Sequence, residues 1–245
     1  MTTPETPVPA APKHIPVLTD FLRLLRVLVS PTEVFEEQKA APTFWVPWLL
    51  LCVLLVPATY LVSSLSFPLQ LDVARTAAAA RGQPLPAAAE AMMKYTIVVA
   101  MPVFTLVMLL LTAGVMYLVL MIFGGEVRYK GLMSVAVFSG MLGVFQVLAT
   151  FAVLKLRGPE GLTTLADFQA SFGLDLLLPT DASAPKFLEG MLKGITPFSL
   201  WGLVITATGI RTMEKTSKGA AWTAAAVSLV LGLLIGGLGA SFGPK

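Results

Sequence analysis

The chain contains 245 residues, of which 56% are hydrophobic and 13% are charged, with a net charge of +3. An ordinary soluble domain carries charge on about a quarter of its residues. The composition therefore excludes that class and predicts an all-α, polytopic membrane helix bundle. The small net charge and the absence of a basic stripe argue against a nucleic-acid partner. The single cysteine, Cys52, excludes an intrachain disulfide and offers no thiolate cluster for a metal, and we expect no cofactor.

The N-terminal segment combines a polar tail with a short amphipathic helix. Residues 1–18 are rich in proline and lack the apolar core of a cleaved signal peptide, which predicts a disordered cytosolic tail. Residues 19–43 are predicted to form cytosolic interfacial helices, because apolar residues recur at helical spacing while Arg23 and Arg26 lie on the other side. The two arginines are candidates for contacts with anionic lipid headgroups; the alternative is that this helix docks on the bundle.

A second short helix is predicted to follow, ending at about Lys39. Ser30, Pro31 and Glu33 have the form of a capping box. In this motif the serine accepts a hydrogen bond from the first-turn amides, the proline suits the first helical position, and the glutamate reaches back to the capping residue.

Five apolar stretches are close to the length of about 20 residues that crosses a hydrocarbon core. They define a membrane domain of residues 44–242 with five transmembrane helices. Trp45 and Trp48 form an aromatic anchor at its start and are further candidates for headgroup contacts. The predicted spans cover residues 44–65, 95–123, 132–154, 195–213 and 220–242.

Short helices are also predicted in the two long connections. Residues 72–81 and 87–94 are alanine-rich helical stretches in an outer loop. In the connection 155–194, Thr164 can cap a helix over residues 165–172, and residues 185–193 show apolar side chains on one side. We expect these last helices to lie on the outer membrane surface or over the bundle as a lid.

Two short turns between spans decide the predicted orientation. Short cytoplasmic connections are enriched in lysine and arginine, whereas long loops cross a membrane regardless of charge. We therefore expect both turns and the N-terminus in the cytosol and the C-terminus outside, in a bacterial cytoplasmic (inner) membrane. The turns contain the cations Arg128, Lys130, Arg211, Lys215 and Lys218.

Small and polar residues within the spans are candidates for helix packing. In the last span, residues spaced four apart form a small-residue stripe that lets another helix approach closely, either another span of the same chain or a second copy. Gln146 is a mid-membrane amide, which costs free energy unless it is hydrogen-bonded, so we expect it to face another helix. The small-residue stripe consists of Ala224, Ser228, Gly232, Gly236 and Ala240, and the other packing candidates are Ser139, Gly143 and Gly202.

Several of these segments carry a resemblance to a known family. The run from Ile195 to Ile210 with Trp201 and Gly209, followed by a lysine-bearing turn, resembles the last two spans of the Yip (Ypt/Rab-interacting protein) family of integral membrane proteins. Ser30-Pro31 ahead of the two tryptophans, and the glycine-rich turn 124–130, are similar to prokaryotic members. The resemblance implies five spans and a cytosolic N-terminus. Rab-type GTPase binding, known for eukaryotic members, is not expected, because their acidic cytosolic signature is missing.

Three classes of function remain to be compared. The resemblance and the composition favour a non-enzymatic membrane protein that acts through helix packing with membrane-protein partners, with itself, or by organising lipid. The alternative is a small transporter or channel for an uncharged solute, with a path along Gln146, Thr105, Thr112 and Thr206. Transporters usually hold charged residues at membrane depth, and such residues are missing from the interior of the five spans. An enzyme is not expected, because catalytic motifs are missing.

Overall fold

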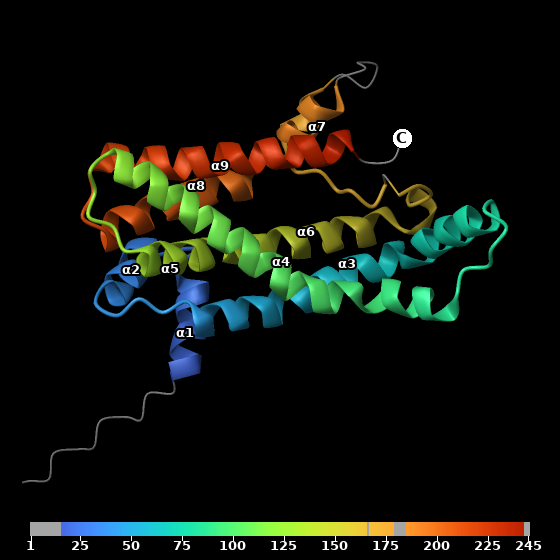
Figure 1. Cartoon of the computed structure of the whole chain (residues 1–245), viewed down its shortest axis with the longest axis horizontal. Helices are drawn as coiled ribbons and strands as arrows, with labels where there is room; N and C mark the ends of the chain where they lie inside the picture. Colours follow the sequence, from blue (N-terminus) through green and yellow to red (C-terminus); the bar gives the residue numbers. More distant parts are fainter. Residues whose placement is uncertain (1–15, 166, 179–184, 243–245) are drawn as a thin grey trace, which may run out of the picture.

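The computed structural model describes residues 16–165, 167–178 and 185–242, and the described part is built from helices (Figure 1). Residues 1–15 of the predicted disordered tail lie outside the described residues. The first helix begins at Pro16, inside the predicted tail. The elements are α1 Pro16–Arg26, α2 Pro31–Lys39, α3 Trp45–Ala79, α4 Ala87–Ile122, α5 Tyr129–Ser139, α6 Met141–Arg157, η1 Pro159–Gly161, η2 Leu174–Leu177, α7 Lys186–Gly194, α8 Pro197–Met213 and α9 Lys218–Ser241.

The first two long helices extend well beyond the predicted spans. Helices α3 and α4 have 35 and 36 residues, or about 50 Å each at 1.5 Å per residue, against a hydrocarbon core of about 30 Å. The prediction of separate short helices at 72–81 and 87–94 is therefore wrong, because these stretches belong to the end of α3 and the start of α4. Alanine has the highest helix propensity, so nothing stops α3 before Gly82, whose φ is +69°.

The predicted third span is a broken helix made of α5 and α6, interrupted at Gly140. Every residue from Gly131 to Phe138 is buried, which is typical of a helix surrounded by protein on all sides. The break lies beside α3: a Cβ on Gly140 would approach Leu51 Cδ2 to 3.2 Å. The glycine therefore lets α3 pass close to the bend.

Helices α1 and α2 dock against the bundle at the end where the α8–α9 turn lies (Figure 1). Leu24, Val27 and Phe35 are fully buried, and the Phe35 ring packs edge-on to Phe138 of α5 with centroids 6.1 Å apart. Trp201 Nε1 of α8 donates a 3.0 Å hydrogen bond to the carbonyl of Leu28, directly after α1. We call α1 and α2 together the N-terminal platform.

The start of α2 differs from its prediction. Ser30 is the N-cap residue and Pro31 opens the helix, but the Ser30 side chain makes no capping hydrogen bond. Glu33 does not reach back to Ser30, because its carboxylate is paired with Arg26 at 3.1 Å. The predicted capping box is therefore wrong, although the helix forms and ends at Lys39 as expected.

The connection 155–194 contains one of its two predicted helices. Helix α7 occupies the predicted position 185–193. The predicted helix 165–172 is wrong for the described residues of that range, which form turns and irregular chain. The Asp167 carboxylate accepts hydrogen bonds from the backbone amides of Thr163 and Thr164 at 3.0 and 2.6 Å, and these local bonds favour a turn over a helix.

Four segments of the described chain are long and apolar enough to cross a membrane. Helix α8 has only 17 residues, whereas each of these four segments has at least 24. The chain is thus an all-α, multi-pass membrane protein, and the fifth span is not confirmed. The four segments are Trp45–Ala79, Val98–Ile122, Tyr129–Arg157 and Lys218–Ser241.

Candidate functional site

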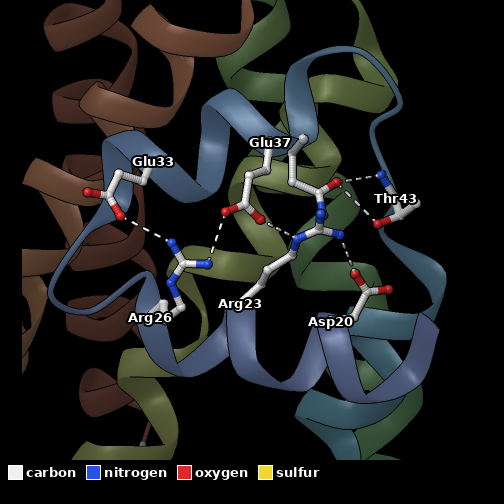
Figure 2. Close-up of polar contacts among 7 residues, drawn as sticks. Asp20, Arg23, Arg26, Glu33, Glu37 and Thr43 are labelled. Atoms are coloured by element: carbon white, nitrogen blue, oxygen red, sulfur yellow. Dashed lines mark hydrogen bonds and ion pairs between the residues drawn. The ribbon is translucent and has the colours of Figure 1, made fainter. Parts of the chain in front are cut away.

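The two arginines of α1 are engaged in ion pairs within the N-terminal platform (Figure 2). Arg23 reaches Glu37 at 2.8 Å and Asp20 at 3.2 Å. Arg26 reaches Glu37 at 3.0 Å and Glu33 at 3.1 Å. These pairs, with the buried face of α1, favour the docked helix over a helix that lies freely on the lipid. Headgroup contact by the two arginines stays a prediction.

Glu37 joins the two arginines and so holds α1 against α2 (Figure 2). The hydrogen bond from Arg23 is the main reason why the pKa of Glu37 is lowered from its ordinary value, with Arg26 contributing. The neighbouring Gln38 is buried, and its Oε1 accepts hydrogen bonds from the backbone amide and the hydroxyl of Thr43 at 3.0 and 3.2 Å. The platform is thereby tied to the start of α3.

The aromatic anchor at the start of α3 is partly exposed. Trp45 is 56% exposed, whereas Trp48 is half-buried and packs against the core. Their rings lie edge to face with centroids 5.7 Å apart. Trp45 is thus positioned for the predicted headgroup contact, which stays a prediction for both residues.

Of the predicted packing residues near the middle of the bundle, two lie at helix contacts. Thr206 Oγ1 of α8 donates a 3.0 Å hydrogen bond to Ser139 Oγ at the end of α5. A Cβ on Gly202 would lie 3.5 Å from Leu142 Cδ1 of α6. Gly143 faces open space, with nothing within 4 Å of such a Cβ. Gln146 is half-buried, and its side-chain amide makes no hydrogen bond in the described part of the chain, so the expected helix partner is not seen there.

The small-residue stripe of α9 is packed over only part of its length. Ala224 is fully buried. Ser228 Oγ is bonded to the Ala224 carbonyl of its own helix at 2.9 Å. Gly232 is exposed, and nothing lies within 4 Å of a Cβ built on it. Among the described residues, no other helix approaches the stripe at Gly232. At its C-terminal end the stripe does meet another helix, because Gly236 and Ala240 lie against Gly190 of α7.

The close contact at the C-terminal half of α9 is with α7, and sequence reasoning missed its two main residues (Figure 1). A Cβ on Gly237 would lie 2.8 Å from the Phe187 carbonyl oxygen and from Met191 Cγ. A Cβ on Gly190 would lie 2.9 Å from the Gly236 carbonyl oxygen. The sequence did hold a signal, because Gly190 and Gly194 are four residues apart on one face of α7.

The two predicted cytosolic turns pack against one another. Glu126 and Lys215 form an isolated antiparallel bridge and an ion pair of 3.0 Å. Arg128 donates from Nη2 to the carbonyl of Met213 at 3.0 Å and to that of Lys39 at 3.2 Å. One arginine thus links the turns to the end of α2.

Glu214 is a buried carboxylate at this junction, in the polar break between the last two predicted spans. Its side chain is 1% exposed. Oε2 accepts a 2.9 Å hydrogen bond from the Arg128 amide, while Oε1 has no partner in the described structure. Burial raises the pKa of Glu214 above its ordinary value, and the Arg128 contacts oppose this only in part. A Cβ on Gly131 would overlap the carboxylate, so the glycine makes room for it.

A cleft of about 590 Å³ lies between the distal halves of α3 and α4, at the end of the bundle opposite the platform. Helix α3 lines it with Tyr60, Ser63 and Gln70, whose side chains carry polar groups. Helix α4 contributes Lys94 at one end and Phe104 at the other. The cleft is therefore apolar over part of its wall and polar over the rest, which suits an amphipathic ligand.

Comparison with known proteins agrees with this architecture. A protein-family model, the Yip1 domain, matches residues 25–240. No curated protein and no solved structure shows a significant match. The matched region runs from the end of α1 to the last turn of α9 and includes both packed turns. Because the match covers most of its length, the chain belongs to the Yip1 domain family.

Proposed function

We propose that this protein is a non-enzymatic membrane scaffold of the Yip type that acts through helix packing with membrane-protein partners or by organising lipid. Several of its polar side chains hold its own helices together, as Thr206 does with Ser139 and Trp201 with Leu28. Such contacts support a preassembled bundle. Of the four residues of the alternative solute path, Thr206 is engaged in this way and Thr112 is bonded to Met108 of its own helix, so the scaffold remains the proposal.

The observation that carries the proposal is the open glycine face of α9. Gly232 and Gly239 are exposed, and nothing lies within 4 Å of a Cβ built on either. They are seven residues apart and so share one side of the helix. In lipid, helices associate through close backbone approach at small residues. A helix of a partner protein, or of a second copy, would find such a surface here.

The proposal includes five spans, with the N-terminus in the cytosol and the C-terminus outside, in a bacterial inner membrane. The fifth span is α8. Its 17 residues correspond to about 26 Å, at the lower limit for a transmembrane helix. The dense cations of the two packed turns support a cytosolic position for that end of the bundle. Binding of a Rab-type GTPase is not proposed.

Photocrosslinking in native membranes tests the scaffold. A photoreactive amino acid at Gly232 should capture a membrane-protein helix, identified by mass spectrometry, or a second copy of the chain. The matched control is Val230, which is 49% exposed and points to the opposite side of α9, because two residues turn the helix by about 200°. Capture of the same proteins at equal yield from both positions would contradict a partner surface at Gly232, and capture of lipid alone from Gly232 would exclude helix packing there and leave only the organisation of lipid.

A further inference from the structure

We propose that the cleft between the distal halves of α3 and α4 is a binding site for one anionic phospholipid. The inference rests on the proposed function, since it names one lipid class that the scaffold would organise. The cleft has a volume of about 590 Å³, within the range of about 300 to 1,000 Å³ typical of ligand sites. It combines an apolar wall with an unpaired cation, and these two features match the two parts of a phospholipid.

The apolar wall would hold an acyl chain. Phe67, Met101 and Phe104 line the cleft, and a neighbouring groove that shares Phe104 continues along α4 to Val107. From Lys94 to Val107 the helix rises by about 20 Å, a length that a lipid tail can follow. Because Phe104 and Val107 are 60% and 46% exposed, the protein leaves this surface to another apolar molecule.

Lys94 supplies the charge that an anionic headgroup requires. Its Nζ lies 5.8 Å from the centroid of the Tyr95 ring, and no carboxylate pairs with it in the described part of the chain. Glu90, one helical turn away, is occupied by two hydrogen bonds from Arg75 of 2.7 and 3.0 Å. The Lys94 ammonium is therefore available to a phosphate.

The depth of Lys94 also fits a headgroup. The apolar segment of α4 that can cross the membrane begins at Val98, so Lys94 lies about 6 Å beyond it along the helix. That position falls in the headgroup layer, while Phe104 lies below the boundary, among the acyl chains. One lipid molecule can thus reach the cation and the apolar wall together.

Polar side chains between these two parts distinguish the cleft from an ordinary lipid-facing surface. Tyr60, Ser63 and Gln70 line it from α3 and offer hydroxyl and amide groups beside the apolar wall. Gln70 Nε2 is already bonded to Ser66 Oγ at 2.7 Å, which fixes the side chain. The Arg75–Glu90 pair joins the two helices beyond the cleft. An apolar helix from another protein would leave the Lys94 ammonium without a partner, which disfavours that occupant.

Photolabelling with a defined lipid tests the site. The full chain is placed in phosphatidylcholine vesicles that contain a trace of photoactivatable phosphatidylglycerol, and the labelled peptides are mapped. We expect labels on α3 and α4 around Phe67 and Met101. Lys94→Gln should lower this labelling by about fivefold, the effect of one cation near an anionic lipid. Ala100→Trp, which fills the cleft, should abolish it.

Lys155→Gln is the matched control. Lys155 also lies at the end of a long helix, with Nζ 5.7 Å from the centroid of an aromatic ring, that of Phe151, but it does not line the cleft. Its removal should leave labelling unchanged. Equal effects of the two lysine substitutions, equal labelling by a phosphatidylcholine probe, or equal labelling of α6 would overturn the proposal in favour of bulk lipid.

Two further readouts separate the remaining outcomes. Inorganic phosphate at millimolar concentration should not compete with the probe; competition would mean that the site takes a free anion and not a lipid. Crosslinking from Gly232 should persist in Lys94→Gln and in Ala100→Trp. Loss of lipid labelling with intact crosslinking from α9 confirms that the site is separate from the partner surface. Absence of lipid labelling in the folded wild type overturns this inference alone, because the scaffold is tested at α9.

Discussion

At the scale of single residues, Glu214 shows how burial and charge compete at the junction of the two turns. The carboxylate has one hydrogen bond at 2.9 Å and an arginine at 3.7 Å, and these favour its ionised form. Burial disfavours that form and is the larger effect, so the pKa of Glu214 is raised. The folded state therefore binds this proton more tightly than the unfolded state, and stability falls as the pH rises from about the ordinary pKa of 4.5 through the raised value.

Glu214→Gln should remove this dependence. The amide oxygen can still accept from the Arg128 backbone, but no charge is buried. We expect the Tm of the variant, relative to wild type in the same detergent, to rise as the pH is raised from about 4.5 to 8, by an amount that reflects about 1.4 kcal/mol for each unit of pKa shift. Glu126→Gln is the control, because the Glu126 side chain is 78% exposed. A difference in Tm that is flat with pH would refute the raised pKa.

The pKa of Glu37 is shifted in the opposite direction to that of Glu214. It is lowered, chiefly by the hydrogen bond from Arg23, so the ion pairs of the platform stabilise the fold above the ordinary pKa and are lost as the pH falls through the lowered value. Glu37→Gln should loosen α1 at neutral pH and speed amide hydrogen exchange of Leu24 and Val27, measured by mass spectrometry. Glu36→Gln, which loses only a 3.9 Å pair with Lys39, should leave exchange unchanged. Similar exchange in both variants would show that the network does not hold α1 in place.

At the scale of elements, the α7–α9 contact decides which glycines of the last helix matter for folding. Substituting Gly237 with isoleucine drives a side chain into Phe187 and Met191, so we expect a loss of about 1–3 kcal/mol, as for overpacked cores. Gly232→Ile meets open space and should be neutral or slightly stabilising, since glycine is a poor helix former. Unfolding in detergent compares the two. Greater damage from Gly232→Ile would mean that α9 is packed at Gly232 and not through the face that contacts α7.

The sequence predicted elements better than contacts. The apolar runs located every long helix, because about 20 apolar residues have few alternatives to spanning a membrane. The ends of α3 and α4 were missed, because alanine-rich stretches continue a helix wherever no breaker intervenes, and Pro57 and Pro68 did not act as breakers. Glu214 and Gly237 were missed for another reason. Their roles depend on which helix lies opposite, and periodicity within one helix does not specify a neighbour.

At the scale of the whole molecule, the platform, the two turns and α5 form one polar and tightly packed end, while the distal halves of α3 and α4 project from the other (Figure 1). Arg128 lies in the first turn. It donates hydrogen bonds to Met213 and Glu214 at the second turn and to the Lys39 carbonyl of the platform, and so links these three parts. The platform and the two turns are therefore expected to lie on the same side of the membrane. This constraint links the position of the turns to the number of spans.

The side on which the C-terminus lies decides whether α8 crosses the membrane. If α8 is a span, the chain crosses five times and its ends lie on opposite sides; if only the four longer segments cross, both ends lie on the same side. With five spans, a reporter enzyme fused after Lys245 should be active outside the cytosol, and one inserted at Gly124 should be active inside. Helices α8 and α9 are joined by the short turn from Glu214 to Ser217, and a short link between antiparallel helices favours two crossings. Two cytosolic readings would leave four spans and would place the two turns on opposite sides of the membrane, against the Glu126–Lys215 contact that joins them.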